Sequence, residues 1–168
     1  MLPTGISVRH PRIYLVEDSA ILLKFLRELL QSVGAEVIGQ ADSARIAMRE
    51  IRRLRPDVAI VDITLQRGNG FDVLRALAEE KNDERPVRIV LTNHSSAPYR
   101  NAAKRFGAEY FFDKSTEIIK MLKIVVAKLQ PRQNNAERVI VSSERVEHVP
   151  NTSPDARATT ARPRESDS

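Results

Sequence analysis

The segment IYLVEDS, residues 13–19, places four apolar or aromatic residues directly before two adjacent carboxylates. Ile13–Val16 is typical of a strand that is buried on both faces of a sheet. Glu17 and Asp18 stand where this strand is expected to end, and two neighbouring negative charges there require a positive partner. The first question that the sequence raises is what that positive partner is.

Short apolar runs alternate with segments of helical periodicity from Arg12 to Gln130. The predicted strands are Ile13–Val16, Glu36–Ile38, Val58–Val61, Val87–Leu91 and Tyr110–Phe112. The predicted helices run approximately over Ile21–Leu30, Ala44–Ile51, Phe71–Leu77, Ala97–Phe106 and Thr116–Leu129. Five consecutive β-α units predict an α/β fold, in which helices cover both faces of a parallel sheet.

The composition of the chain changes after residue 130. Residues 131–168 are rich in Ser, Thr, Asn, Pro and Arg and lack apolar periodicity apart from Val139–Val141, which predicts a disordered C-terminal tail. Residues 12–130 are then the folded domain and residues 1–11 an N-terminal extension. The chain has no cysteine and no apolar stretch near the ~20 residues of a membrane span, so we expect a cytoplasmic protein without membrane association.

Chemically active side chains stand at the expected carboxyl ends of four strands. In open α/β sheets this edge is where ligands bind, and the ends of parallel strands meet there. The residues are Glu17 and Asp18 after the first strand, Asp62 after the third, Thr92 at the end of the fourth and Lys114 after the fifth. We therefore expect three carboxylates, one hydroxyl and one ammonium group to converge.

These residue types indicate phosphoryl chemistry assisted by a metal ion. Three carboxylates without His or Cys suit a hard cation, and Mg²⁺ is the abundant one. Such a cation would also be the positive partner of Glu17 and Asp18. An aspartate carboxylate can attack phosphorus, while Lys114 and the Thr92 hydroxyl would hold the phosphoryl oxygens.

With these residues in place, the chain resembles the receiver domain of two-component response regulators over roughly Arg12–Leu129. The matching features are the acid pair in VEDS, the residues Asp62, Leu65 and Gly70 in DITLQRGNG, and Thr92 and Lys114. The resemblance implies a flavodoxin-like, doubly wound, five-stranded parallel sheet with strand order 2-1-3-4-5, a (βα)5 fold.

The resemblance also implies roles for individual residues. Asp62 would accept the phosphoryl group, with Lys114 and Thr92 assisting. The Mg²⁺ ligands would be Glu17, Asp18, Asp62 and the main-chain carbonyl of Thr64. Thr92 and Phe111 would form the conformational switch.

The function that follows from the resemblance is a single-domain response regulator, which is a phosphorylation switch rather than an enzyme. A sensor histidine kinase or a histidine phosphotransfer protein would donate the phosphoryl group, and an unknown downstream protein would bind the switched face. Two alternatives stay open. One is a receiver-like binding module that works without phosphate. The other, less favoured, is a phosphohydrolase with an Asp nucleophile, since Thr64 stands where such enzymes repeat an Asp.

Two surface features of the sequence each allow two interpretations. The arginines around the second helix (Arg45, Arg49, Arg52, Arg53 and Arg55) and the basic residues of the fourth (Arg100, Lys104 and Arg105) are either solvated or dock a partner. We expect a protein partner, not DNA, because the net charge of +5 is small and no helix-turn-helix follows the domain.

The fifth helix carries more apolar residues than one buried stripe requires. Ile118, Leu122, Val125 and Leu129 can face the sheet, which would leave Ile119, Ile124 or Met121 outside or at an edge. An exposed apolar strip favours protein contact, including a homodimer through the fourth helix, fifth strand and fifth helix. The alternative is that the tail covers this helix.

Overall fold

The computed structural model describes residues 10–80 and 85–129 of the chain. Residues 1–9 of the expected N-terminal extension and the whole expected tail, residues 131–168, lie outside this part. The predictions for these two segments therefore stay predictions.

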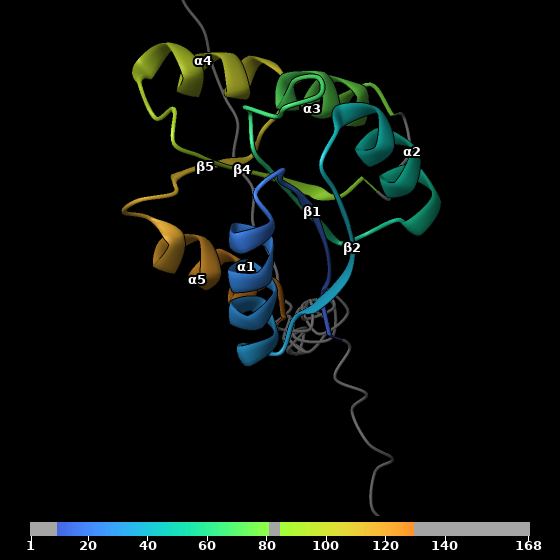
Figure 1. The fold of residues 1–168 in the computed structure, drawn as a ribbon, viewed down its shortest axis with the longest axis vertical. Helices are drawn as coiled ribbons and strands as arrows, with labels where there is room; N and C mark the ends of the chain where they lie inside the picture. Colours follow the sequence, from blue (N-terminus) through green and yellow to red (C-terminus); the bar gives the residue numbers. More distant parts are fainter. Residues whose placement is uncertain (1–9, 81–84, 130–168) are drawn as a thin grey trace, which may run out of the picture. The chain divides into compact units, whose positions relative to one another are not determined.

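Strands and helices alternate five times along the described residues (Figure 1). The strands are β1 (Arg12–Val16), β2 (Glu36–Ala41), β3 (Val58–Val61), β4 (Val87–Thr92) and β5 (Tyr110–Asp113). The helices are α1 (Ala20–Ser32), α2 (Ala44–Leu54), α3 (Gly70–Ala78), α4 (Ala97–Arg105) and α5 (Ile118–Leu129). Among these helices none has both the length and the apolar character needed to cross a bilayer.

The strands form one parallel sheet in the order β2-β1-β3-β4-β5, which confirms the predicted topology. The central strand β3 is buried along its whole length. Val61, its last residue, pairs with Val16 of β1 and Val90 of β4. The carboxyl ends of these three strands are thus aligned at one edge of the sheet.

Helices cover both faces of the sheet (Figure 1). Because side chains alternate along a strand, Tyr14 and Val16 belong to the core shared with α2, α3 and α4. Ile13 and Leu15 belong to the core shared with α1 and α5. Alternate residues of β1 are therefore buried in two separate apolar layers, as a doubly wound sheet requires.

The second strand is longer than its sequence predicts, because it reaches Ala41 and not only Ile38. Gly39 and Gln40 interrupt the apolar run there, so periodicity alone ends the strand too early. Gly39 pairs with Tyr14, and a Cβ atom at Gly39 would lie 2.6 Å from the Tyr14 ring. The glycine is thus needed for close packing against a large aromatic side chain.

The last helix begins at Ile118, two residues later than predicted. A tight turn comes first, in which the Glu117 N–H donates to the Asp113 carbonyl at 2.9 Å. The Glu117 carboxylate in turn accepts the Asp113 N–H at 3.0 Å. This turn contains Lys114 and therefore sets where the lysine leaves the sheet.

Candidate functional site

Three carboxylates meet at the carboxyl edge of the sheet, as the sequence predicts. Glu17 and Asp18 follow β1, and Asp62 follows the neighbouring strand β3. One carboxylate oxygen from each lies within 4.8 Å of the other two. Glu17 and Asp62 are buried and Asp18 is half-buried, so the group has one open side.

Within the described chain, Lys114 is the positive partner of Glu17, the first of the two adjacent acids, and of Asp62. Its Nζ lies 2.6 Å from Asp62 Oδ2 and 2.7 Å from Glu17 Oε2, and its side chain is only 9% exposed. Burial acts to lower the pKa of the Lys114 ammonium, but its hydrogen bonds to both carboxylates raise that pKa above its ordinary value. The lysine is therefore charged at neutral pH.

The two acids of the pair have different surroundings. Glu17 contacts Lys114 and also accepts the Ser19 N–H at 3.0 Å. Burial is the main influence on Glu17 and raises the pKa of its carboxyl, although Lys114 and Ser19 act to lower it. Asp18 instead accepts the Gln66 N–H at 2.8 Å, and no lysine or arginine among the described residues forms a salt bridge with it.

The donor set fits a divalent cation. Three carboxyl groups cluster around a single ammonium group, and no nitrogen or sulfur ligand belongs to the cluster. Oxygen ligands of this kind suit Mg²⁺. Glu17, Asp18 and Asp62 are the side chains that could hold the ion.

Thr92 ends β4 and is fully buried. Its hydroxyl accepts the His94 N–H at 3.3 Å, and its carbonyl accepts the Lys114 N–H at 3.0 Å. Because β4 lies between β3 and β5, Thr92 stands between the strands that carry Asp62 and Lys114. The hydroxyl and the ammonium group are thus delivered to the same edge as the carboxylates.

The loop after β3 closes around Asp62. The exposed Thr64 donates its N–H to Asp62 Oδ1 at 3.2 Å, and the Gly70 N–H bonds the Ile63 carbonyl at 2.9 Å. A Cβ atom at Gly70 would lie 2.1 Å from the Asp62 carbonyl oxygen, so no other residue fits without moving the backbone. Asn69 then caps α3 by accepting the Phe71 N–H at 2.8 Å.

Phe111, the expected switch residue, is half-buried on β5. The guanidinium group of Arg100 lies over its ring, with 4.6 Å from the guanidinium carbon to the ring centroid. The sequence predicts Arg100 as part of a basic group that is either solvated or docks a partner. In the structure its side chain instead bonds to Glu117 within the domain. The acid at position 117, in the segment after β5, is the one sequence signal for this ion pair.

The fifth helix buries Leu122 and Val125 as predicted, and the predicted Ile118 packs against the same core. Met121 is fully buried beside Leu122 and Val125, so the expectation that it could lie outside is wrong. Ile119 is 62% exposed and Val126 39% exposed, which confirms an apolar strip on the outer face. The Leu129 side chain lies outside the described part of the chain.

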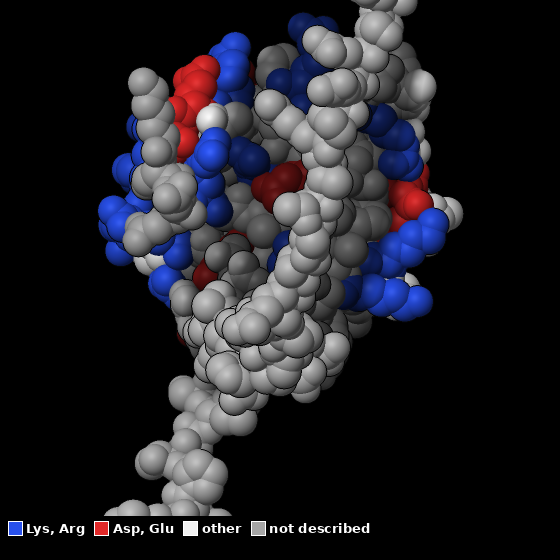
Figure 2. All heavy atoms as spheres, turned by 180° about the vertical axis from the view of Figure 1, so that it is seen from behind, with Lys and Arg blue, Asp and Glu red and all other residues white. Residues whose placement is uncertain are grey.

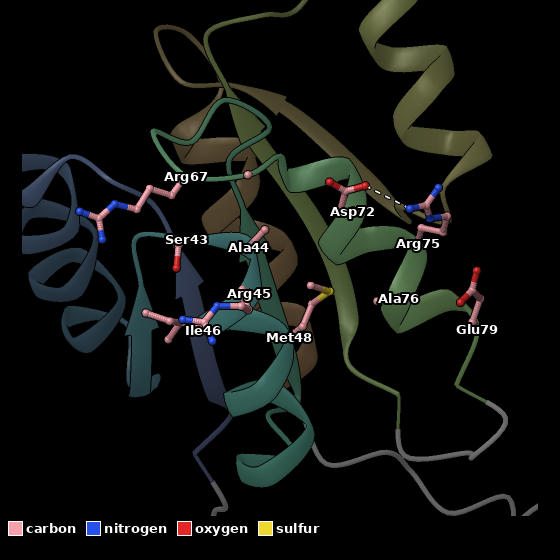
Figure 3. A pocket seen from close by; sticks show the side chains of 11 residues that line it. Ser43, Ala44, Arg45, Ile46, Met48, Arg67, Asp72, Arg75, Ala76 and Glu79 are labelled. Atoms are coloured by element: carbon pink, nitrogen blue, oxygen red, sulfur yellow. Dashed lines mark hydrogen bonds and ion pairs between the residues drawn. The ribbon is translucent and has the colours of Figure 1, made fainter.

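A cavity of about 670 Å³ opens between α2 and α3 (Figure 3). Its lining includes Met48, Ala76 and the ion pair of Asp72 with Arg75, which are 3.2 Å apart. None of the clustered carboxylates lines it, so the chemistry indicated by the sequence is not located there.

The basic residues around α2 are partly paired with acids. Arg52 lies 2.8 Å from Glu80, and Arg49 lies 3.7 Å from Glu50. Figure 2 shows basic and acidic side chains next to each other on both sides of the face that it draws. Mixed charge of this kind differs from the continuous basic stripe typical of nucleic-acid-binding proteins.

Comparison of the chain with known proteins identifies one family. The sequence pattern of the family described as "Response regulator receiver domain" matches residues 13–126. The chemotaxis protein CheY of Thermotoga maritima is 32% identical over 66 residues, which cover 39% of this chain and 55% of CheY. The protein-glutamate methylesterase/protein-glutamine glutaminase 2 of Koribacter versatilis is 32% identical over 136 residues, 72% of this chain and 37% of that protein.

A solved structure shares the fold. The BeF3-activated N-terminal receiver domain of Klebsiella pneumoniae RstA superposes with a TM-score of 0.63 at 22% identity, covering 71% of this chain and 99% of that one. The chain spans only about a third to a half of the length of the two curated relatives above. The methylesterase match is therefore no evidence of esterase activity here.

Proposed function

Because the chain belongs to the family of response regulator receiver domains, we propose that it is a switch controlled by Mg²⁺-dependent phosphorylation of Asp62. A sensor histidine kinase or a histidine phosphotransfer protein donates the phosphoryl group. Residues 12–130 carry this function. A cytoplasmic location, expected from the composition, completes the proposal.

The observation that carries the proposal is the geometry around Asp62. Its carboxylate is buried, touches the Lys114 ammonium at 2.6 Å and has two further carboxylates within 4.8 Å. A nucleophile held by a cation beside a hard-metal donor set is the arrangement that phosphoryl transfer needs, since the protein supplies mainly position and charge.

In the proposed reaction an oxygen of Asp62 forms a bond to phosphorus while the bond from phosphorus to the donor nitrogen breaks. The electron pair of that bond leaves with the imidazole of the donor histidine. Lys114 and the Thr92 hydroxyl bind phosphoryl oxygens. Glu17, Asp18, Asp62 and the Thr64 carbonyl would hold Mg²⁺, which would neutralise the phosphoryl charge.

The phosphoryl group adds about −1.5 to −2 charges to the site, if it titrates as other phosphorylated side chains do. Thr92 then moves towards the new anion and Phe111 turns inward. The face made by α4, β5 and α5 changes with them and binds a downstream protein or a second copy of the chain. We propose no DNA or membrane contact for this domain.

Two other functions predict different chemistry. A phosphohydrolase needs a general acid near the nucleophile, and position 64, two residues after Asp62, holds an exposed threonine. A binding module that works without phosphate does not need Lys114 and Asp62 in contact. The threonine at position 64 therefore argues against the phosphohydrolase, and the contact at 2.6 Å favours the switch over the phosphate-independent module.

The test is phosphorylation of the full chain with acetyl phosphate in the presence of Mg²⁺, followed by intact mass spectrometry. We expect one added phosphoryl group per chain, which is stable for minutes and absent when EDTA replaces Mg²⁺. Asp62→Asn should show no adduct. Asp72→Asn is the matched control, because Asp72 is an exposed aspartate on α3, and it should react as the wild type does.

The alternatives appear as distinct results. Release of many inorganic phosphates per chain would support the phosphohydrolase. No adduct with acetyl phosphate and none with a phosphorylated histidine donor would support the phosphate-independent module. Because the RstA receiver domain was activated with BeF3, beryllofluoride serves as a second probe that should bind at Asp62 with Mg²⁺.

A further inference from the structure

Arg100 joins α4 to three other segments through one side chain. Its Nε donates to the Ser95 carbonyl at 3.1 Å, in the loop before α4. Its Nη1 donates to the Phe111 carbonyl on β5 at 3.2 Å, and its Nη2 to Glu117 Oε2 at 3.2 Å. The planar guanidinium group can make these bonds and still lie against the Phe111 ring, as it does here at 4.6 Å.

Glu117, the acid that holds Arg100, is itself firmly bound. Its carboxylate accepts the Lys120 ammonium at 2.9 Å and the Asp113 N–H at 3.0 Å. The hydrogen bond from Lys120 first, and then those from Asp113 and Arg100, lower the pKa of this carboxyl to about 2. Glu117 is therefore a permanent anion at neutral pH and fixes one end of the guanidinium group.

The same contacts flank the active lysine. Asp113 and Glu117 lie on either side of Lys114, and Phe111 lies three residues before it. Arg100 thus bonds to the segment 113–117, which is held at both ends. Lys114 lies within this segment and donates its ammonium group to Asp62. The group formed by Arg100, Phe111 and Glu117 is called the Arg100 clasp below.

We propose that Arg100 is a positioning residue that holds the Phe111 ring in its resting position and so opposes switching. The inference rests on the proposed function. If the ring turns inward, it leaves the face of the guanidinium group, while the bonds to the Phe111 carbonyl and to Glu117 can persist. The cation–π contact therefore stabilises one ring position only. A contact made in one of two states shifts the equilibrium towards that state.

Loss of the clasp should consequently favour the phosphorylated form. The probe is beryllofluoride with Mg²⁺, titrated into the full chain and followed by NMR of ¹³C-labelled phenylalanine rings. Arg100→Met keeps the aliphatic stem and removes the charge and the hydrogen bonds. We expect it to bind beryllofluoride about two- to five-fold more tightly than the wild type, the factor that an exposed cation–π contact represents.

The ring resonance separates positioning from general destabilisation. In free Arg100→Met the Phe111 signal should move part of the way towards its position in beryllofluoride-bound wild type. Lys104→Met, which removes an exposed positive charge one turn along the same helix, should change neither the affinity nor the ring signal. In a Phe111→Leu background, Arg100→Met should no longer tighten binding.

Glu117→Gln provides an independent route, because it weakens the clasp without changing Arg100, and it should tighten binding in the same direction. Unchanged or weaker binding in both Arg100→Met and Glu117→Gln, with a wild type that binds, would overturn the clasp and leave the proposed function intact. A wild type that neither binds beryllofluoride nor is phosphorylated would remove the proposed function and this inference together.

Discussion

Replacement of Asp18 by asparagine should stabilise the metal-free protein, although it removes a proposed metal ligand. Asp18 faces two other carboxylates within 4.8 Å, while the Lys114 ammonium is bound to those two and not to Asp18. An asparagine keeps an oxygen that can accept the Gln66 N–H, which now bonds Asp18 at 2.8 Å. The substitution therefore removes repulsion and leaves the local hydrogen bond.

The magnitude follows from the distances. Two unit charges 4.8 Å apart repel by about 3.5 kcal/mol at an effective dielectric constant of about 20, and Asp18 has two such neighbours. Attraction to the nearby ammonium cancels roughly one of these terms, and salt and the half-exposed position of Asp18 screen the rest. We expect the free energy of unfolding to rise by about 1–2 kcal/mol.

The assay is urea unfolding of both proteins, first in EDTA and then in Mg²⁺. In EDTA the unfolding midpoint of Asp18→Asn should exceed that of the wild type. Mg²⁺ should stabilise the wild type by about 2.7 kcal/mol at one hundred times its dissociation constant and the variant by much less. When the metal is added, the difference between the two unfolding midpoints should therefore shrink or change sign.

Asp72→Asn is the control, since Asp72 is 51% exposed and paired with Arg75 outside the cluster. Its effect should stay within about 0.5 kcal/mol, as is usual for surface substitutions, in either condition. An Asp18→Asn protein that is less stable than the wild type in EDTA would refute the reasoning. It would mean that Asp18 has a favourable interaction larger than the repulsion.

Three further predictions concern stability. Lys114→Met leaves Glu17 and Asp62 buried without their cation, so unfolding at pH 7 should become easier by about 3–5 kcal/mol. Part of this loss should be recovered in urea titrations at pH 5, because the unpaired carboxyls then take up protons in the folded state. Gly70→Ala should lower the free energy of unfolding by about 1–3 kcal/mol, measured in urea, and reduce phosphorylation, since the new methyl group collides with the Asp62 carbonyl. A fully phosphorylated Gly70→Ala protein would contradict this explanation. Glu117 has a folded-state pKa of about 2, below its ordinary 4.5, so its contribution to stability is present above about pH 4.5 and lost towards pH 2. Between pH 4.5 and pH 2 the free energy of unfolding of Glu117→Gln, measured in urea, should therefore fall less than that of the wild type. An equal fall in both proteins would show that Glu117 does not have a lowered pKa in the folded state.

The sequence was most informative where one local rule decides the structure. Val58–Val61 is a continuous β-branched and apolar run, and its bounds were predicted as observed. The end of β2 was predicted too early, because pairing with β1 and the space needed by Tyr14 extend the strand through Gly39. Met121 was misplaced because apolar residues lie on several sides of its helix, and periodicity then cannot tell which side packs on the sheet.

The site residues likewise divide into features that the sequence predicts and features that it does not. Glu17, Asp18, Asp62, Thr92 and Lys114 were all predicted at one edge, because parallel strands bring their carboxyl ends together whatever the details of packing. The pairing of those residues was not predictable. The sequence suggested a divalent cation as the partner of the two adjacent acids, whereas the described chain itself supplies Lys114 to Glu17 and leaves Asp18 without it.

By itself, then, the order of apolar and polar residues determined the α/β class, the alternation of strands and helices, and the edge of the sheet at which the site residues lie. These are local and periodic properties, and each depends on residues close together in the chain. Only the tertiary structure decided which carboxylate receives the lysine, which helix face is buried and that Arg100 turns inward to Phe111 and Glu117. Each of these contacts joins distant segments at hydrogen-bonding or van der Waals range, where a shift of about one ångström selects another partner.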